Sequence, residues 1–156
     1  MQRNRVPIGK WLVVMTMSLA LTMTVSCMRR SLLNSYKPTY GGWLSTDTIR
    51  FQVDSITRND IYSFSVGLRY TDRYPYQDIW LALSITTSTT THIDTLHLQL
   101  LDLKPNLVER GVMIHEQEQL VKAYRLAKGQ KVDIAVYSLM RDSLLEGITD
   151  LGLKVE

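Results

Sequence analysis

The chain has 156 residues, of which 18 are Lys or Arg and 15 are Asp or Glu. Three of the basic residues, Arg3, Arg5 and Lys10, lie near the N-terminus, and the chain from residue 27 onward is balanced, with 15 basic and 15 acidic residues. This balance argues against a nucleic-acid-binding protein, which needs a basic face. With one cysteine, Cys27, the chain cannot form an internal disulfide bond.

Residues 1–26 have the pattern of a secretory signal peptide. A basic head is followed by an uncharged, largely apolar run over residues 11–26, and the small residue Ser26 directly precedes Cys27. The run is shorter than the roughly 20 apolar residues that span a bilayer. Val25-Ser26-Cys27 is typical of bacterial lipoproteins, which are cleaved before a cysteine whose thiol carries a diacylglycerol. We therefore predict lipidation at Cys27; the alternatives are a soluble secreted protein with a free thiol and an uncleaved N-terminal anchor.

Residues 27–42 show no periodicity and contain Lys37-Pro38 and Gly41-Gly42, which favour turns and loops. We interpret them as a lipidated N-terminus and tether. The folded domain is then expected over residues 43–156.

Alternating apolar and polar residues dominate from residue 49 onward and predict β-strands, in which successive side chains point to opposite faces. The apolar faces are Ile49, Phe51 and Val53; Tyr62, Phe64, Val66, Leu68 and Tyr70; Ile79, Leu81, Leu83 and Ile85; Leu96, Leu98 and Leu100; Val132, Ile134 and Val136; and Leu151, Leu153 and Val155. Further strands are expected at residues 111–115 and 119–124, although the second stretch is also rich in helix formers. Turn signals separate the segments, and residues 86–91 are expected to form a hairpin tip. The pattern predicts an antiparallel β-sandwich, Ig-like or jelly-roll-like, of about seven or eight strands.

Catalytic and metal-binding patterns are weak. His92 and Asp94 would share one face of a strand and His97 the other, so the three do not form a natural metal site. The stretch starting at His115 begins like a metalloprotease motif, but Gln119 stands where the second histidine is needed. We predict a non-enzymatic protein without metal or cofactor. An envelope enzyme would require converging carboxylates or histidines, for example among Asp72, Asp78, Asp102 and Asp133.

Aromatic and charged residues concentrate between residues 69 and 80. Tyr74, Tyr76 and Trp80, with Arg73, form a candidate partner surface, because Tyr, Trp and Arg are enriched at binding hot spots. The same rings could stack on a sugar. The structural alternative is a strand connection whose aromatic side chains cover the end of the core.

Four tripeptides, beginning at Asp47, Asp54, Asp94 and Asp142, have Asp, then Ser or Thr, then an aliphatic residue. This pattern resembles the O-glycosylation sequon of Bacteroidetes periplasmic proteins. It supports an exported protein of that group.

The tail and the middle of the chain together resemble the GldH family of Bacteroidetes gliding-motility lipoproteins. In the middle the matching residues are Arg69, Tyr74-Pro75-Tyr76, Asp78 and Ile79-Trp80-Leu81. In the tail they are Met140, Arg141 and Asp142, then Leu145-Glu146-Gly147, then Asp150 to Glu156, including Gly152. The family's usual Trp-Leu-Gly-x-Gly stretch is replaced here by residues 101–114, in which only Gly111 matches.

This resemblance implies a lipid-anchored, non-enzymatic accessory of gliding motility and of the linked type IX secretion apparatus, with envelope proteins as partners. By the usual sorting habits, the absence of an acidic run after Cys27 places it in the outer membrane, facing the periplasm. Met140, Arg141, Asp142, Gly147, Asp150 and Gly152 are expected to support the fold. The alternative function is a glycan-binding outer-membrane lipoprotein.

Overall fold

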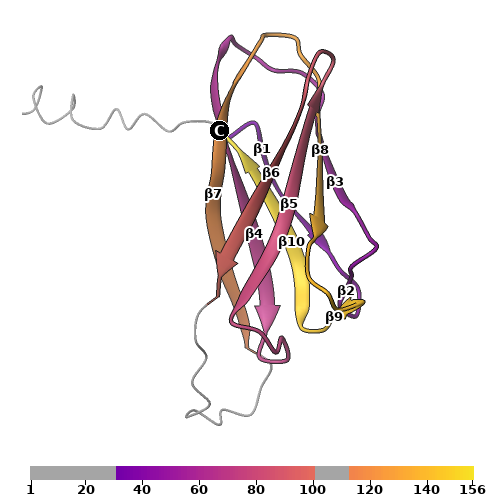
Figure 1. The fold of residues 1–156 in the computed structure, drawn as a ribbon. Coiled ribbons are helices and arrows are strands. Elements are labelled where there is room, and N and C mark those ends of the chain that lie inside the picture. Colours follow the sequence, from indigo (N-terminus) through magenta and orange to yellow (C-terminus); the bar gives the residue numbers. More distant parts are fainter. Residues whose placement is uncertain (1–30, 101–112) are drawn as a thin grey trace, which may run out of the picture. The chain divides into compact units, whose positions relative to one another are not determined.

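The computed structural model describes residues 31–100 and 113–156 (Figure 1). The predicted signal peptide, Cys27, Asp102 and Gly111 lie outside these ranges. The described residues form ten strands and contain no helix that could cross a membrane. The strands are β1 Leu33–Pro38, β2 Trp43–Leu44, β3 Ile49–Val53, β4 Asp60–Thr71, β5 Asp78–Thr87, β6 Thr91–Gln99, β7 Ile114–Leu126, β8 Val132–Ser138, β9 Leu144–Leu145 and β10 Ile148–Val155.

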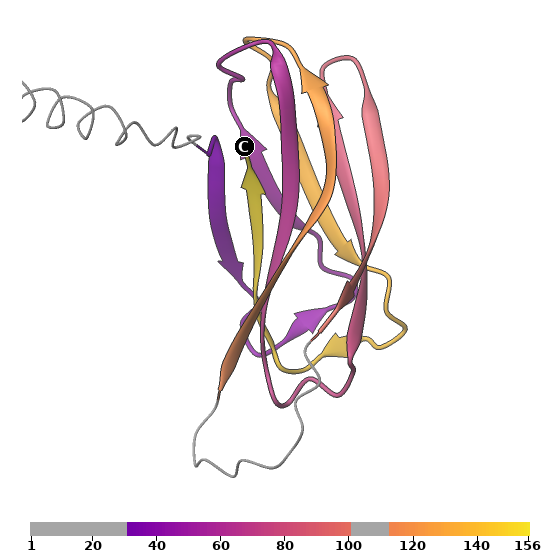
Figure 2. The ribbon, with the colours of Figure 1, turned by 90° about the vertical axis from the view of Figure 1, so that its left-hand side faces the viewer.

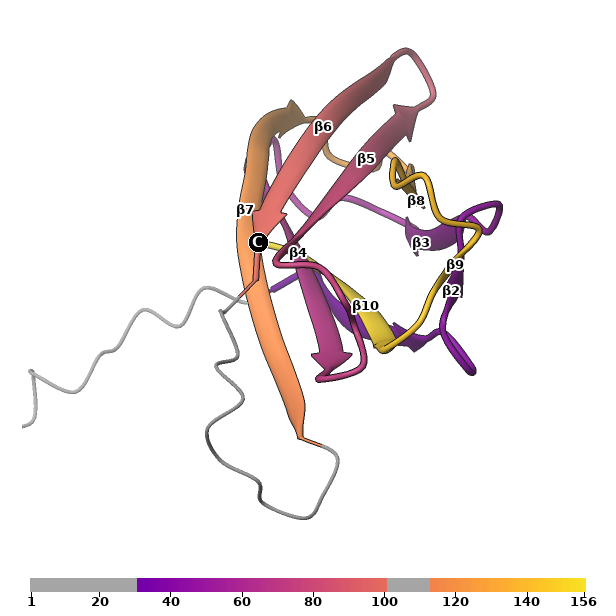
Figure 3. The same cartoon turned by 60° about the horizontal axis from the view of Figure 1, so that its bottom comes forward.

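Two four-stranded antiparallel sheets form the body of the molecule, and the end view separates them as two layers (Figure 3). One sheet has the order β1-β10-β4-β7 and the other the order β3-β8-β5-β6; β2 and β9 form a separate two-stranded ribbon. The predicted all-β antiparallel sandwich is confirmed. Eight of the ten strands have at least five residues, but they are not the expected set. Strand β1 lies in the predicted tether, and the strands expected at residues 111–115 and 119–124 correspond to the single strand β7 in the described residues.

The core is built from the alternating faces that the sequence predicts. Phe64, Val66 and Leu68 of β4 are fully buried, as are Leu81 of β5 and Leu98 of β6. The sheets bury their apolar faces against each other because that removes apolar surface from water, at about 25 cal/mol per Å². Outward residues differ in exposure: Trp80 on β5 remains accessible, whereas Ser65 on β4 and Ala82 on β5 are buried.

Strand β1 corrects the predicted tether. Residues 33–38 pair with the last strand, from Leu33 opposite Val155 to Pro38 opposite Asp150, so the sandwich begins before residue 43. The sequence L-N-S-Y-K-P does not alternate clearly because an edge strand buries little of its surface: no residue of β1 is fully buried. The prediction that residues 27–42 form a tether is therefore wrong for residues 33–38.

Strand β7 resolves the ambiguous stretch around residues 119–124. It is a 13-residue strand paired with β4, with an irregularity in the ladder between Phe64 and Ser65. Its helix-forming residues adopt the strand because pairing with β4 decides the conformation over local propensity. The expected hairpin at residues 86–91 is confirmed, with Thr87 N donating to Thr90 O at 2.8 Å.

The connections gather at two opposite ends of the sandwich (Figure 2). We call the end formed by residues 39–48, 72–77 and 139–147 the tip, at the bottom of Figure 1. The end formed by residues 54–59, 88–90 and 127–131 is the base. Strand β1 starts on the base side, where Leu33 lies opposite Val155, and runs toward the tip.

Candidate functional site

The β4–β5 connection divides the predicted aromatic surface into buried and exposed parts. Tyr74 is only 7% exposed, belongs to the core, and donates its hydroxyl to the carbonyl of Asp78 at 3.0 Å. Burial raises the pKa of the Tyr74 hydroxyl. The prediction that Tyr74 belongs to a partner surface is therefore wrong: it closes the end of the core, as the structural alternative held.

Tyr76 and Asp142 bring the middle and tail motifs together. Tyr76 is 41% exposed and donates its hydroxyl to a carboxylate oxygen of Asp142, 66 residues later in the chain. The hydrogen bond to Asp142 raises the pKa of the Tyr76 hydroxyl. Residues 139–143 are irregular, and the side chain of Asp142 is held by Tyr76.

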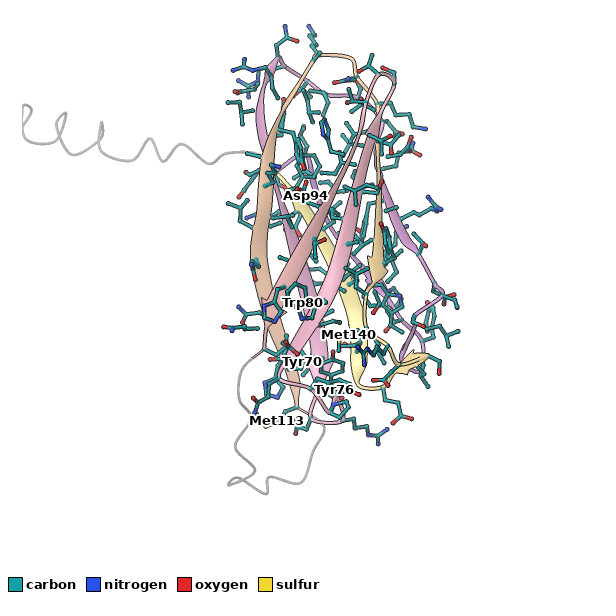
Figure 4. The ribbon with its side chains drawn as sticks, in the orientation of Figure 1. Tyr70, Tyr76, Trp80, Asp94, Met113 and Met140 are labelled. Carbon is teal, nitrogen blue, oxygen red and sulfur yellow. The ribbon has the colours of Figure 1, made fainter. Side chains whose placement is uncertain are left out.

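Trp80 lies on the outer face of β5, near the tip (Figure 4). It is 42% exposed and stacks on His97 of β6, with ring centroids 4.1 Å apart and planes 11° apart. His97 Nε2 lies 2.7 Å from Asp78 Oδ2, and the backbone N–H of Trp80 donates to Met140 Sδ at 3.5 Å. One face of the Trp80 ring is therefore covered by His97, whose own position is restrained by Asp78.

Gly147 fixes the turn between β9 and β10. Its φ is +84°, and an added Cβ would overlap the backbone nitrogen of Tyr74. Its carbonyl accepts the backbone N–H of Thr71 at 2.8 Å. Gly147 therefore allows the β9–β10 turn to lie directly against the β4–β5 connection. The other tail residues are spread out: Asp150 of β10 lies opposite Arg69 of β4 in the strand register, and Arg141 is exposed.

Two open cavities lie side by side at the tip and share Arg73 and Glu146. One, of about 410 Å³, is lined by Tyr76, Asp142 and Leu144 among others; the second, of about 470 Å³, by Tyr40 and the β9–β10 turn. Exposed large apolar side chains also concentrate toward this end. They are Tyr40, Leu44, Tyr76, Trp80, Met113, Ile114, Leu139 and Leu144, eight of the eleven in the described residues.

The residues considered for metal binding do not converge. His92 packs on the ring of Tyr124 at 5.0 Å, Asp94 pairs with Lys122 at 3.3 Å, and His97 contacts Asp78. His115 Nε2 lies 2.9 Å from Asp72 Oδ1. In residues 31–100 and 113–156 no group of three His, Cys, Asp or Glu residues has metal-binding geometry.

Tyr36 organises a cluster that sequence reasoning missed. Its side chain crosses the outer face of the first sheet, over Gly152 of β10 and Gly67 of β4, and its hydroxyl donates to Glu116 of β7 at 2.8 Å. The guanidinium of Arg69 lies 3.9 Å from the centre of the Tyr36 ring and donates to the same carboxylate at 2.8 Å. We call Tyr36, Gly67, Arg69, Glu116 and Gly152 the Tyr36 cluster. The signal available in the sequence was a pair of glycines inside strands, which marks a close approach.

Comparison with known proteins identifies the family. The family model described as "GldH lipoprotein" matches residues 31–155. The chain belongs to the GldH lipoprotein family. It is also 25% identical over 146 residues to a protein of Flavobacterium johnsoniae named "Gliding motility lipoprotein GldH"; this similarity covers 88% of the chain and 92% of that relative.

The GldH match begins two residues before β1 and ends with β10. It therefore includes β1, in the region where the sequence pattern predicts a tether. It also includes the Tyr36 cluster and both motifs that meet at the tip. The family resemblance predicted from residues 69–81 and 140–156 is confirmed.

Tyr76→Phe is expected to loosen residues 139–143 without unfolding the protein. The hydroxyl of Tyr76 ties the β4–β5 connection to Asp142, and both side chains lie at the surface, where one hydrogen bond contributes about 1 kcal/mol. Amide hydrogen exchange should accelerate over residues 139–143 and remain unchanged in β4. Unchanged exchange in that segment would show that the bond does not restrain it.

Tyr36→Phe is expected to change the dependence of stability on alkaline pH. Burial, followed by the hydrogen bond to Glu116, raises the pKa of Tyr36 from 10.0 to about 12. This contribution to stability is complete below pH 10, the unfolded value, and is lost as the pH rises through 12, because the unfolded chain loses the proton first. In urea unfolding, the stability advantage of wild type over Tyr36→Phe should be smaller at about pH 11 than at about pH 9. An advantage that is the same at both values would contradict the raised pKa.

Proposed function

We propose that this protein is a lipid-anchored, non-enzymatic accessory of the gliding-motility machinery and the linked type IX secretion apparatus. The observation that carries the proposal is membership of the GldH lipoprotein family over the whole sandwich, with a relative named as a gliding-motility lipoprotein. Cys27 carries the acyl chains. The signal Val25-Ser26-Cys27 followed by Met28-Arg29-Arg30, without acids, supports an outer-membrane protein facing the periplasm.

The partner surface in this proposal is the tip, centred on Tyr76, Trp80 and Arg73. Tyr76 is restrained by Asp142 and Trp80 by His97. Binding a partner would therefore cost little side-chain conformational entropy at these two residues. Exposed Tyr, Trp and Arg side chains among other apolar groups suit a protein hot spot. The proposed partner is an envelope protein of the motility or secretion machinery.

The geometry gives no specific support to the alternative of glycan binding. A sugar platform would need exposed rings in one plane, but Tyr74 is buried and its ring makes an angle of 71° with that of Tyr76. One face of Trp80 is already occupied by His97. The protein-docking proposal uses the same exposed residues without requiring a flat platform.

Crosslinking in the native cells tests the proposed function. The tagged protein is crosslinked and purified, and its partners are identified for wild type and for Tyr76→Ala combined with Trp80→Ala. We expect gliding or type IX secretion components with wild type and their loss with the double variant. The matched control is Ile61→Ala with Ile93→Ala, two exposed apolar residues distant from the tip, which should retain the partners. Recovery of glycan-import proteins, or of nothing specific, would overturn the proposal.

Cys27→Ala tests the anchor separately. Without the thiol no acyl chain can be attached, and one or more chains supply the membrane affinity, at about 0.8 kcal/mol per buried CH₂. The variant is expected in the soluble fraction after cell lysis, whereas wild type sediments with membranes. Unchanged sedimentation of Cys27→Ala would exclude Cys27 as the anchor.

A further inference from the structure

The strand that follows Cys27 enters the fold in a particular direction. Leu33, the first residue of β1, is the sixth residue after Cys27, so tension on the lipid reaches β1 before any other strand. Strand β1 starts on the base side and runs toward the tip, and β10 runs the opposite way beside it. The chain that leads from Cys27 therefore enters the sandwich on the base side, while the proposed partner surface lies at the tip.

This arrangement determines the direction in which a pulling force acts on β1. If the tip is held and the N-terminus is pulled toward the base, the force acts along the strands. Inter-strand hydrogen bonds of an antiparallel pair are perpendicular to the strands, so the hydrogen bonds of the β1–β10 ladder, which extends over six residues of β1, resist the sliding together. Pulling Leu33 away from Val155 at the base would instead open the same pairs one at a time.

Contacts at both ends of β1 add to the ladder. The backbone N–H of Leu32 donates to Val155 O at 2.7 Å on the base side. On the tip side, Thr39 donates from its backbone N–H to Thr149 O at 2.8 Å and from its buried hydroxyl to Ile148 O at 2.6 Å. The ladder is therefore closed at each end, where fraying would begin.

The Tyr36 cluster extends this attachment across the sheet. From β1, the Tyr36 side chain passes over Gly152 of β10 and Gly67 of β4 and reaches Glu116 of β7, the opposite edge strand. For β1 to slide, the ring of Tyr36 must leave both glycines and the Arg69 guanidinium, and its hydroxyl must leave Glu116. An edge strand held only by one ladder would lack this resistance.

We propose that the sandwich transmits mechanical tension between the lipid anchor and a partner held at the tip. The proposal rests on the proposed function for the anchor and the docking surface. Strand β1 and the Tyr36 cluster are the elements that carry the tension. The mechanical property itself belongs to the isolated sandwich and can be measured without either partner or membrane.

Single-molecule pulling tests the inference. Residues 31–156 form one compact unit with its own core, so the chain from Cys27 made without lipid retains the fold. Cys27 is the only cysteine and supplies one handle. The second handle is attached at Ser143→Cys, at the tip, or at Glu156→Cys, directly after the residue that lies opposite the start of β1. At equal loading rates the rupture force from Cys27 to position 143 should be at least about twofold that from Cys27 to position 156, because the hydrogen bonds of the ladder break together in the first geometry and one after another in the second.

Tyr36→Ala is expected to lower the rupture force in the tip geometry, while Asn34→Ala, an exposed neighbour on the same strand, should leave it unchanged. With Tyr36 present, equal rupture forces for pulling at position 143 and at position 156 would overturn the inference. This comparison does not need the Tyr36→Ala variant, so it remains valid if that variant does not fold. Such a result would leave partner recovery in the crosslinking experiment unaffected. If the crosslinking experiment recovered no such partner, the proposed function would be rejected, but the expected difference between the two rupture forces would not change.

Discussion

Gly147→Ala is expected to destabilise the sandwich by about 2–6 kcal/mol, the sum of backbone strain and overlap in a packed site. The φ of Gly147 is +84°, a region that residues with a Cβ rarely adopt, and the Cβ of alanine would overlap the backbone nitrogen of Tyr74. Because the overlapping atom belongs to the main chain, no rotation of a side chain can relieve it. The β9–β10 turn would have to move away from Tyr74 and Thr71 together.

Urea unfolding, monitored by tyrosine and tryptophan fluorescence, measures this effect against a matched control. Gly129 has a φ of +80°, but nothing lies within 4 Å of the position that an added Cβ would take, so Gly129→Ala tests the backbone strain alone. Its cost should be about 1 kcal/mol. Equal losses for the two variants would show that the contact between Gly147 and Tyr74 contributes nothing.

Gly152→Ala is expected to destabilise the fold by about 1–3 kcal/mol, the usual range for an added group in a packed site. An alanine Cβ would lie 2.5 Å from the ring of Tyr36. The ring cannot shift freely, because it lies under Arg69 and its hydroxyl bonds to Glu116. Here the obstacle is a side chain, so removing that side chain should remove the penalty.

A double-mutant cycle tests the reason as well as the size of the effect. In the Tyr36→Ala background, Gly152→Ala should cost less than it does in wild type, because the overlapping ring is gone. The difference between the two costs is the coupling between Gly152 and Tyr36. The same cost in both backgrounds would show that Gly152 is needed for another reason, such as its own backbone conformation.

Most of the core could be predicted from the sequence because each long strand buries one face. Phe64, Val66 and Leu68 alternate with less apolar residues. This alternation identifies the buried face of a strand even when the pairing of the strands is unknown. Strand β1 could not be found in this way. Its place depends on the partner β10, more than a hundred residues later, and its informative residue, Tyr36, points to the outer face.

The candidate site was predicted in its residue types but not in its exposure. Tyr74, Tyr76 and Trp80 are spaced closely in sequence, yet Tyr74 enters the core because the β4–β5 connection turns inward between Thr71 and Asp78. The contact of Tyr76 with Asp142 depends on two connections meeting at the same end of the sandwich. Local sequence patterns do not show which connections come together in space, so the contact between Tyr76 and Asp142 could not be predicted from them.

The pairing of Leu33 with Val155 also determines when the fold can be completed. Ribosomes and secretion channels release a chain from its N-terminus, so β1 emerges first, and its only ladder partner, β10, is the last strand of the described chain. Until β10 arrives, β1 has no sheet to join, and β4 lacks one of its two neighbours. Folding of the complete sandwich would then follow release of the final strand. A chain stalled before residue 148 should therefore remain dependent on chaperones and sensitive to proteases.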